Sequence, residues 1–138
     1  MEDETALIDS ILKENHTAPI VGLSDKPGRP SYIVGKYLKD NGFKITPVNP
    51  QAKDILGEVS YPDLKSIPFP VDVVDVFRRS EEVSAIVEDA IKIGAKVVWM
   101  QEGVIDDDAA ERASKAGLKV VMDRCMRKQH LRMTGRRF

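Results

Sequence analysis

The sequence predicts an α/β fold in which a five-stranded, mainly parallel sheet carries helices on both faces. Short apolar runs typical of buried strands alternate along the chain with segments whose apolar residues recur at helical spacing. The connections are short, and parallel strands require crossovers of this kind. The chain has 138 residues, of which 42% are hydrophobic, which suits a single domain spanning 1–138 with a substantial core.

In the N-terminal half, the pattern predicts a helix, a strand, a second helix and a second strand. Leu7 and Ile11 belong to the apolar face of the first helix, and Gly42 ends the second. Ser31 is expected to cap the second helix. Pro47 lacks a backbone N–H, so the last residues of the second strand are expected to leave the ladder. The predicted bounds are helix 4–14, strand 18–23, helix 32–41 and strand 43–48.

The C-terminal half begins with an irregular segment, 51–70, because its prolines oppose a long helix. A short turn or edge piece is expected at 55–59. Asp72 and Asp75 interrupt the third strand and are expected to be hydrogen-bonded structural residues. His130 is expected on the surface of the last helix. The remaining predicted elements are strand 71–77, a helix from Ser80, strand 96–100, a helix opened by 106–108, strand 118–122 and a basic tail of about 127–138.

Right-handed crossovers leave few topologies for these elements, and a Rossmann-like strand order 3-2-1-4-5 is favoured. In a parallel sheet the carboxyl ends of all strands share one edge, so the loops that follow them collect there. The ligand is then expected at the switch point between the first and fourth strands.

The loop after the first strand has the composition of an anion site. Gly22 ends the strand, Lys26 and Arg29 add two cations, and Ser24 and Ser31 add hydroxyl groups. Backbone N–H groups and the positive end of the following helix favour an anion in this position. A polar loop that binds nothing has the same composition, but the basic residues after the third strand favour a binding edge.

The same loop argues against two common nucleotide motifs. It lacks the G-x-G-x-x-G glycines, the second strand ends without the acidic residue of a dinucleotide site, and G-x-x-x-x-G-K-[ST] is absent. The cations, which include Arg78 and Arg79 after the third strand, suit a ligand with more phosphate charge than NAD, such as coenzyme A. No metal-binding spacing of histidine or cysteine occurs.

Composition narrows the class of protein further. The net charge of −1 gives no electrostatic case for nucleic acid, and no apolar run is long enough to span a bilayer. The acidic N-terminus lacks the features of a signal peptide, and a single cysteine, Cys125, suits a reducing compartment. We therefore expect a soluble, cytoplasmic protein without a nucleic-acid or membrane partner. A homodimer through apolar residues of 51–70 is one option.

Five short motifs, taken in order, carry a resemblance to a known family. They are Gly22-Leu23-Ser24-Asp25 with Arg29 and Ser31, Pro47-Val48-Asn49-Pro50, the run from Val71 to Arg78, Val98-Trp99-Met100-Gln101 with Gly103, and Asp123-Arg124-Cys125. Over about 17–133 the chain resembles the small stand-alone CoA-binding proteins, which are similar to the CoA-binding domain of succinyl-CoA synthetase alpha subunits. The resemblance implies a Rossmann-like domain that holds CoA at the carboxyl edge of its strands.

The resemblance also implies which residues contact CoA. Those of the first loop would meet phosphate, Asn49 and Pro50 would line the adenosine side, and Phe77 and Arg78 would flank the nucleotide or the pantetheine. The full set expected to bind CoA is Gly22, Leu23, Ser24, Lys26, Arg29, Ser31, Val48, Asn49, Pro50, Phe77, Arg78 and Gln101.

We expect a non-catalytic carrier, sensor or regulatory module for CoA or an acyl-CoA, with no catalytic residues. Succinyl-CoA synthetase chemistry needs a phosphorylated histidine in a further domain, which the 138 residues do not contain. A CoA-dependent enzyme or its subunit, and an NAD-type redox domain, stay as alternatives. Cys125 lies beside Arg124, which would lower the thiol pKa and allow a mixed disulfide with CoA. A small apolar packing residue is the other interpretation of Cys125.

Overall fold

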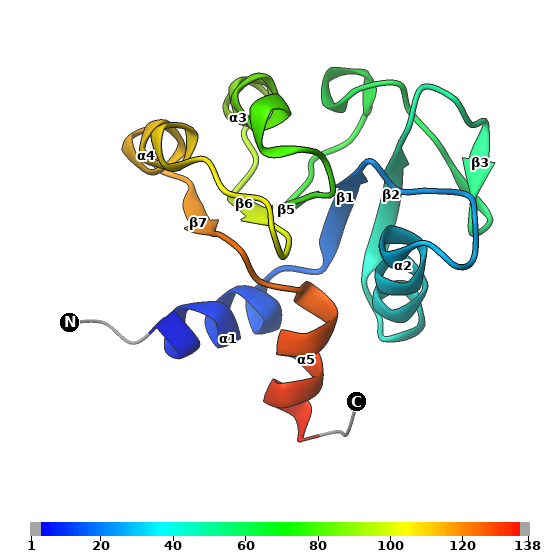
Figure 1. Ribbon diagram of the computed structural model, residues 1–138, viewed down its shortest axis with the longest axis horizontal. Helices are drawn as coiled ribbons and strands as arrows, with labels where there is room; N and C mark the ends of the chain where they lie inside the picture. The colour runs from blue at the N-terminus through cyan, green and yellow to red at the C-terminus, as the bar shows by residue number, and fades with distance from the viewer. Residues whose placement is uncertain (1–3, 136–138) are drawn as a thin grey trace.

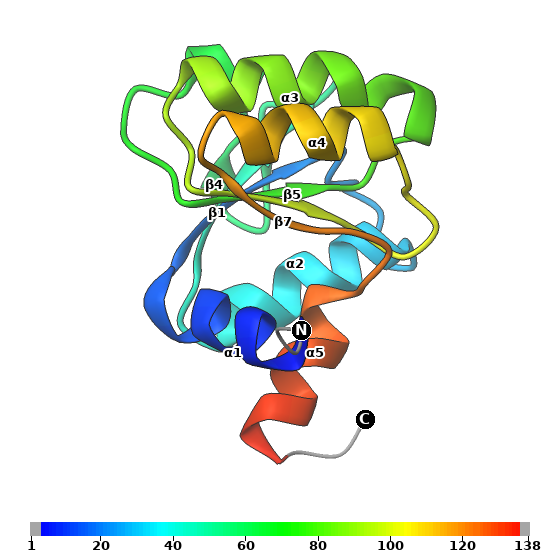
Figure 2. The same ribbon diagram turned by 90° about the vertical axis from the view of Figure 1, so that its left-hand side faces the viewer.

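The computed structural model describes residues 4–135 and contains a parallel sheet between two helical layers (Figures 1 and 2). The five-stranded sheet has the order β2-β1-β5-β6-β7, and all of its neighbouring strands are parallel. The predicted α/β class is therefore confirmed. The strands are β1 (Thr17–Val21), β2 (Lys44–Val48), β5 (Val73–Val76), β6 (Val97–Met100) and β7 (Lys119–Val121).

Helices cover both faces of the sheet. In Figure 2, α3 and α4 lie on one side and α1, α2 and α5 lie on the other. A 3₁₀ turn precedes α3, so that the helix predicted from Ser80 begins as a tighter turn. The helices are α1 (Glu4–Glu14), α2 (Pro30–Asp40), α3 (Val83–Lys92), α4 (Asp107–Lys115) and α5 (Met126–Thr134), with 3₁₀ turns η1 (Leu64–Ser66) and η2 (Ser80–Glu82).

The strand order differs from the predicted 3-2-1-4-5. The third long strand, β5, pairs with β1, so β2 lies at the edge and the order in sequence terms is 2-1-3-4-5. Pro47 is compatible with the edge position, because its carbonyl accepts the N–H of Tyr61 on the outer side of β2, where its own missing N–H also faces. Proline alone does not decide the order here, because β1, which lies between β2 and β5, contains Pro19. Strand β2 also stays in the ladder to Val48, contrary to our expectation.

The segment between β2 and β5 contains a small hairpin, as the expected turn at 55–59 suggested. Strands β3 (Asp54–Ile55) and β4 (Glu58–Val59) are antiparallel. Leu56 and Gly57 join them with φ values of 56° and 76°, the left-handed conformation of tight hairpin turns. After the hairpin, the chain crosses to the far side of β1 and places β5 in the middle of the sheet.

The core is mainly apolar on both sides of the sheet, and Asp75 is the buried carboxylate within it. Trp99 is fully buried in the layer beneath α1, α2 and α5. Asp75, on the neighbouring strand, is also fully buried, and within residues 4–135 neither of its carboxylate oxygens has a hydrogen-bond partner. This contradicts the expected hydrogen-bonded role. Burial raises the pKa of the Asp75 carboxyl well above its usual range. Asp72, by contrast, faces Lys96 at 3.4 Å.

The predicted basic tail, where described, is helix α5 packed against α1 and α2; residues 136–138 lie outside the described part. Arg132 pairs with Asp9 of α1 at 2.6 Å. His130 is buried, not on the surface as expected, and its Nδ1 lies 2.6 Å from the Tyr37 hydroxyl of α2. The amphipathic pattern of α5 does not reveal that His130 is buried. The face of α5 that carries this polar residue packs against another helix instead of facing solvent.

Candidate functional site

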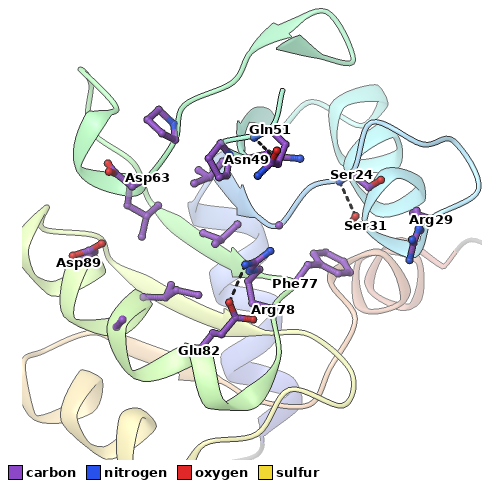
Figure 3. Close-up of a pocket in the computed structure, with 18 of the residues that line it drawn as sticks. Ser24, Arg29, Ser31, Asn49, Gln51, Asp63, Phe77, Arg78, Glu82 and Asp89 are labelled. Atoms are coloured by element: carbon purple, nitrogen blue, oxygen red, sulfur yellow. Dashed lines mark hydrogen bonds and ion pairs between the residues drawn. The ribbon is translucent and has the colours of Figure 1, made fainter. Parts of the chain in front are cut away.

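A cavity of about 780 Å³ opens at the carboxyl ends of β1, β2 and β5 (Figure 3). The switch point therefore lies between β1 and β5, not between the first and fourth predicted strands. Ten of the twelve residues that the sequence predicted line this cavity: Gly22, Ser24, Lys26, Arg29, Ser31, Val48, Asn49, Pro50, Phe77 and Arg78.

Gly22 is required where β1 and β5 come together. Its φ is +91°, and a Cβ atom there would lie 2.2 Å from the carbonyl oxygen of Phe77 and 2.8 Å from Cδ of Arg78. Its N–H donates to the carbonyl of Val48 on the other side. A glycine therefore allows the backbone of the β1–α2 loop to lie against both neighbouring strand ends, and brings it within reach of a ligand.

The β1–α2 loop is held by its own hydroxyl groups. The N–H of Ser24 donates to Oγ of Ser31 at 2.9 Å, and the N–H of Lys26 donates to Oγ of Ser24 at 3.0 Å. Ser31 is not the N-cap that we expected: Arg29 occupies that position and Pro30 begins the helix. Because Pro30 has no N–H and its φ is preset for a helix, α2 starts earlier than the apolar pattern indicated.

The N-terminus of α2 can accept an anion. No side chain of residues 4–135 caps this helix end by a hydrogen bond. The positive dipole end of α2 lies at the cavity, whose lining includes Pro30 and Ser31 of its first turn together with Lys26 and Arg29. The loop therefore combines backbone donors and cations at one end of the cavity.

Asn49 contributes by fixing the floor of the site. Its Nδ2 donates to the carbonyl of Leu23 at 2.9 Å, and its Oδ1 accepts the N–H of Gln51 at 2.8 Å. The amide thus ties the β2 loop to the β1 loop. Leu23, which the sequence predicted as a CoA contact, is fully buried and does not line the cavity.

Charge is unevenly distributed around the cavity. Arg29 lies at the α2 end, whereas Asp63 and Asp89 lie at the opposite end, with Arg78 between them (Figure 3). Lys26 belongs to the same β1–α2 loop as Arg29 and also lines the cavity. Repulsion from the carboxylates directs an anionic group to the α2 end. The opposite end also carries apolar surface, which suits a flat, uncharged group. The sequence did not predict this wall, which consists of Pro62, Asp63, Leu64, Ala85, Ile86 and Asp89.

Arg78 is the cation nearest the centre of the site, and Glu82 holds it. The Nη2 atom of Arg78 lies 2.8 Å from Oε1 of Glu82, and Nε of Arg79 lies 3.4 Å from Oε2. Desolvation opposes ionisation of Glu82, but Arg78 and then Arg79 outweigh it and hold the pKa of this carboxyl below its usual value. Glu82 is therefore an anion that competes with any ligand phosphate for Arg78.

A second pocket, of about 540 Å³, adjoins the first and is where Gln101 lies. Gln101 is buried, and its Oε1 accepts the N–H of Met126. Cys125 lines neither pocket and is buried in the core, 6% exposed. The mixed disulfide with CoA stays a prediction that would require the thiol to leave this packing. Sequence position placed Cys125 at the ligand edge, but α5 turns it inward.

Within residues 4–135, no group of three histidine, cysteine, aspartate or glutamate side chains is arranged to hold a metal ion. No helix in that part of the chain is long and apolar enough to cross a membrane. The described lining of the larger cavity contains neither histidine nor cysteine. The lining offers cations, carboxylates, hydroxyl groups and amides.

The fold and the cavity define an α/β domain with a loop of cations and backbone donors at the switch point of a parallel sheet. Residues 16–130 match a family model described as a CoA binding domain, and the chain belongs to this family. The predicted resemblance to CoA-binding proteins is thereby confirmed.

Relatives and solved structures agree with this assignment. The chain is 38% identical over 125 residues to the uncharacterized protein YneT of Bacillus subtilis, covering 91% of this chain and 93% of that one. It is 34% identical over 79 residues to ADP-forming acetate–CoA ligase II of Archaeoglobus fulgidus, covering 56% of this chain but 12% of that enzyme. A hypothetical protein from Pyrococcus horikoshii has 40% identity and a TM-score of 0.92, with 95% of this chain and 92% of that chain covered. A Thermus thermophilus protein has 28% identity and a TM-score of 0.89, with 96% and 99% covered.

Proposed function

We propose that this protein binds CoA, free or acylated, in the larger cavity and acts as a non-catalytic carrier, sensor or regulatory module. The observation that carries the proposal is the meeting of an uncapped helix N-terminus with Lys26, Arg29 and Arg78 around one cavity. Membership of the CoA-binding family supports the choice of ligand.

The charge distribution supports one orientation of the ligand. The phosphates would lie at the α2 end, where Ser24 and Ser31 hold the loop and cations complement the charge. The adenine, which is flat and uncharged, would lie against the apolar wall formed by Leu64 and Ile86. Its exocyclic amino group could donate to a carboxylate on that wall, such as Asp89.

A non-catalytic role is supported by what the lining offers. The described residues of the larger cavity provide hydroxyls, carboxylates and cations, but no histidine or cysteine that would serve as an activated nucleophile. The relationship to acetate–CoA ligases makes a role as a subunit of a CoA-dependent enzyme the second candidate.

Calorimetry on the full chain tests the proposal. We expect CoA to bind and NAD to bind at least about ten-fold more weakly, because CoA has one more phosphate to pair with the cations. Equal or tighter binding of NAD would overturn the choice of CoA. Release of acid from acetyl-CoA at a rate proportional to the amount of protein would contradict the non-catalytic role.

A further inference from the structure

We propose that the second pocket receives the thiol end of bound CoA and that its charged walls limit the acyl group to short or polar ones. The proposal rests on the proposed function and adds the class of acyl group. Its first support is continuity, because the two pockets share Phe77, Arg78 and Glu82. A ligand longer than the first pocket can thus continue along the sheet edge into the second.

The direction of the ligand follows from charge. With the phosphates at the α2 end and the base against the wall of Leu64 and Ile86, the pantetheine arm must extend out of the first pocket. The two described pockets meet at the residues that they share, Phe77, Arg78 and Glu82. The arm therefore crosses Phe77, and the thiol comes to lie near the loop that follows β6.

The walls of the second pocket are charged on both sides. Arg79 and Glu82 belong to the segment between β5 and α3, and Glu102 follows β6, where it pairs with Lys128 at 3.0 Å. Val104 provides the apolar surface opposite, together with Phe77. A long alkyl chain laid over these ion pairs would remove water from them, and that cost offsets the gain from burying methylene groups.

The loop after β6 is anchored at both sides, so it cannot open into an apolar tunnel without breaking hydrogen bonds. The N–H of Gly103 donates to Oδ1 of Asp123 at 2.7 Å, and the N–H of Ile105 donates to Oγ of Ser80 at 3.0 Å. Asp123 itself has a φ of 60°, which this contact helps to hold. The shape and the charge of the pocket are thus set before a ligand arrives.

A chain-length series of acyl-CoA ligands tests the class of acyl group. We expect acetyl-CoA to bind the full chain with an affinity within about two-fold of CoA, and octanoyl-CoA to bind at least about five-fold more weakly, measured by calorimetry. Octanoyl-CoA that binds as tightly as acetyl-CoA would overturn the limit on the acyl group. A buried apolar tunnel would instead raise affinity by about four-fold for each added methylene. A steady rise of that size would overturn the proposal, even though CoA binding itself would stand.

A cysteine trap tests where the thiol lies. The variants E102C and R79C place a thiol on either wall of the second pocket, and E111C places one on exposed α4 as the matched control. Each is incubated with CoA disulfide, whose bound half is attacked by the introduced thiolate; the mixed disulfide forms and one CoA thiol is released. The unmodified chain reports any reaction of buried Cys125.

We expect E102C and R79C to react with CoA disulfide at least about ten-fold faster than E111C, because binding raises the local concentration of the reagent. Glutathione disulfide should not distinguish the three variants. If the three variants react with CoA disulfide at equal rates but still bind CoA by calorimetry, the placement of the thiol is refuted and the proposed function is not. If the unmodified chain does not bind CoA, the proposed function itself is refuted.

Discussion

The guanidinium of Arg78 lies 2.8 Å from the carboxylate of Glu82, and both side chains line the larger cavity (Figure 3). The contact spans one turn, i to i+4, at the start of the segment that leads into α3. It holds a cation in place over Gly22, where the stem of Arg78 lies against the strand ends. It also means that a ligand phosphate must share or replace this carboxylate.

Replacing Glu82 by Gln should therefore strengthen CoA binding. Half-exposed ion pairs of this kind contribute up to about 1 kcal/mol, so we expect affinity to rise by about two- to five-fold. Calorimetry at low salt measures the change. E81Q, which neutralises the neighbouring carboxylate outside both pockets, is the matched control and should leave affinity unchanged. Weaker binding in E82Q would mean that Glu82 positions Arg78 for the ligand rather than competing for it.

Arg29→Ala and Arg78→Ala should each weaken CoA binding by about ten-fold or more, because a charge-assisted hydrogen bond to phosphate contributes about 1.5–3 kcal/mol. Dephospho-CoA shows which arginine meets the 3′-phosphate, since the variant of that residue should lose less affinity for dephospho-CoA than for CoA. Lys115→Ala, on exposed α4, serves as the control. Unchanged affinity in both arginine variants would place the site elsewhere.

Gly22→Ala should lower both stability and affinity. A Cβ would meet the Phe77 carbonyl at 2.2 Å, and the φ of +91° adds backbone strain, so we expect a loss of about 2–4 kcal/mol in the free energy of unfolding. Urea denaturation measures it. Gly28→Ala is the matched control in the same loop, because a Cβ there meets nothing within 4 Å. Similar losses in both variants would contradict a steric role for Gly22.

Asp75→Val should stabilise the protein, and the gain should grow with pH. The raised pKa keeps the buried carboxyl protonated in the folded state, whereas in the unfolded chain the carboxyl ionises near its ordinary pKa of 3.8. Above that pH the unfolded state binds fewer protons, so wild-type stability falls by up to about 1.4 kcal/mol per pH unit until the folded-state pKa is reached.

Urea midpoints of wild type and Asp75→Val from pH 4 to pH 8 measure this difference. Asp72→Asn is the control, because Asp72 is partly exposed and paired with Lys96. A gap between wild type and Asp75→Val that stays constant over this range would show that Asp75 is ionised in the folded protein or satisfied by bound water.

Local patterns predicted the elements and most of the cavity, because strand ends in a parallel sheet share an edge whatever the strand order. The order itself depends on which strands pair over long range, and proline does not reveal it, because edge strand β2 and central strand β1 each contain one. Ser31 was assigned as a cap because periodicity locates a helix face better than its first residue. The wall with Asp63 and Asp89 is formed by an irregular segment and one face of a helix. Only tertiary packing determines that these two parts of the chain lie close together.

Helix α1 packs against α5, and Asp9 and Arg132 join the two across 123 positions of sequence. During synthesis, residues 4–14 leave the ribosome long before residues 126–134. The apolar face of α1, with Ile8 and Ile11, therefore cannot pack against α5 until the rest of the chain has emerged. The larger cavity, in contrast, draws its lining from residues 21–89 alone. The nascent protein thus contains every described lining residue of the larger cavity before α5 is available to complete the helical layer with α1 and α2.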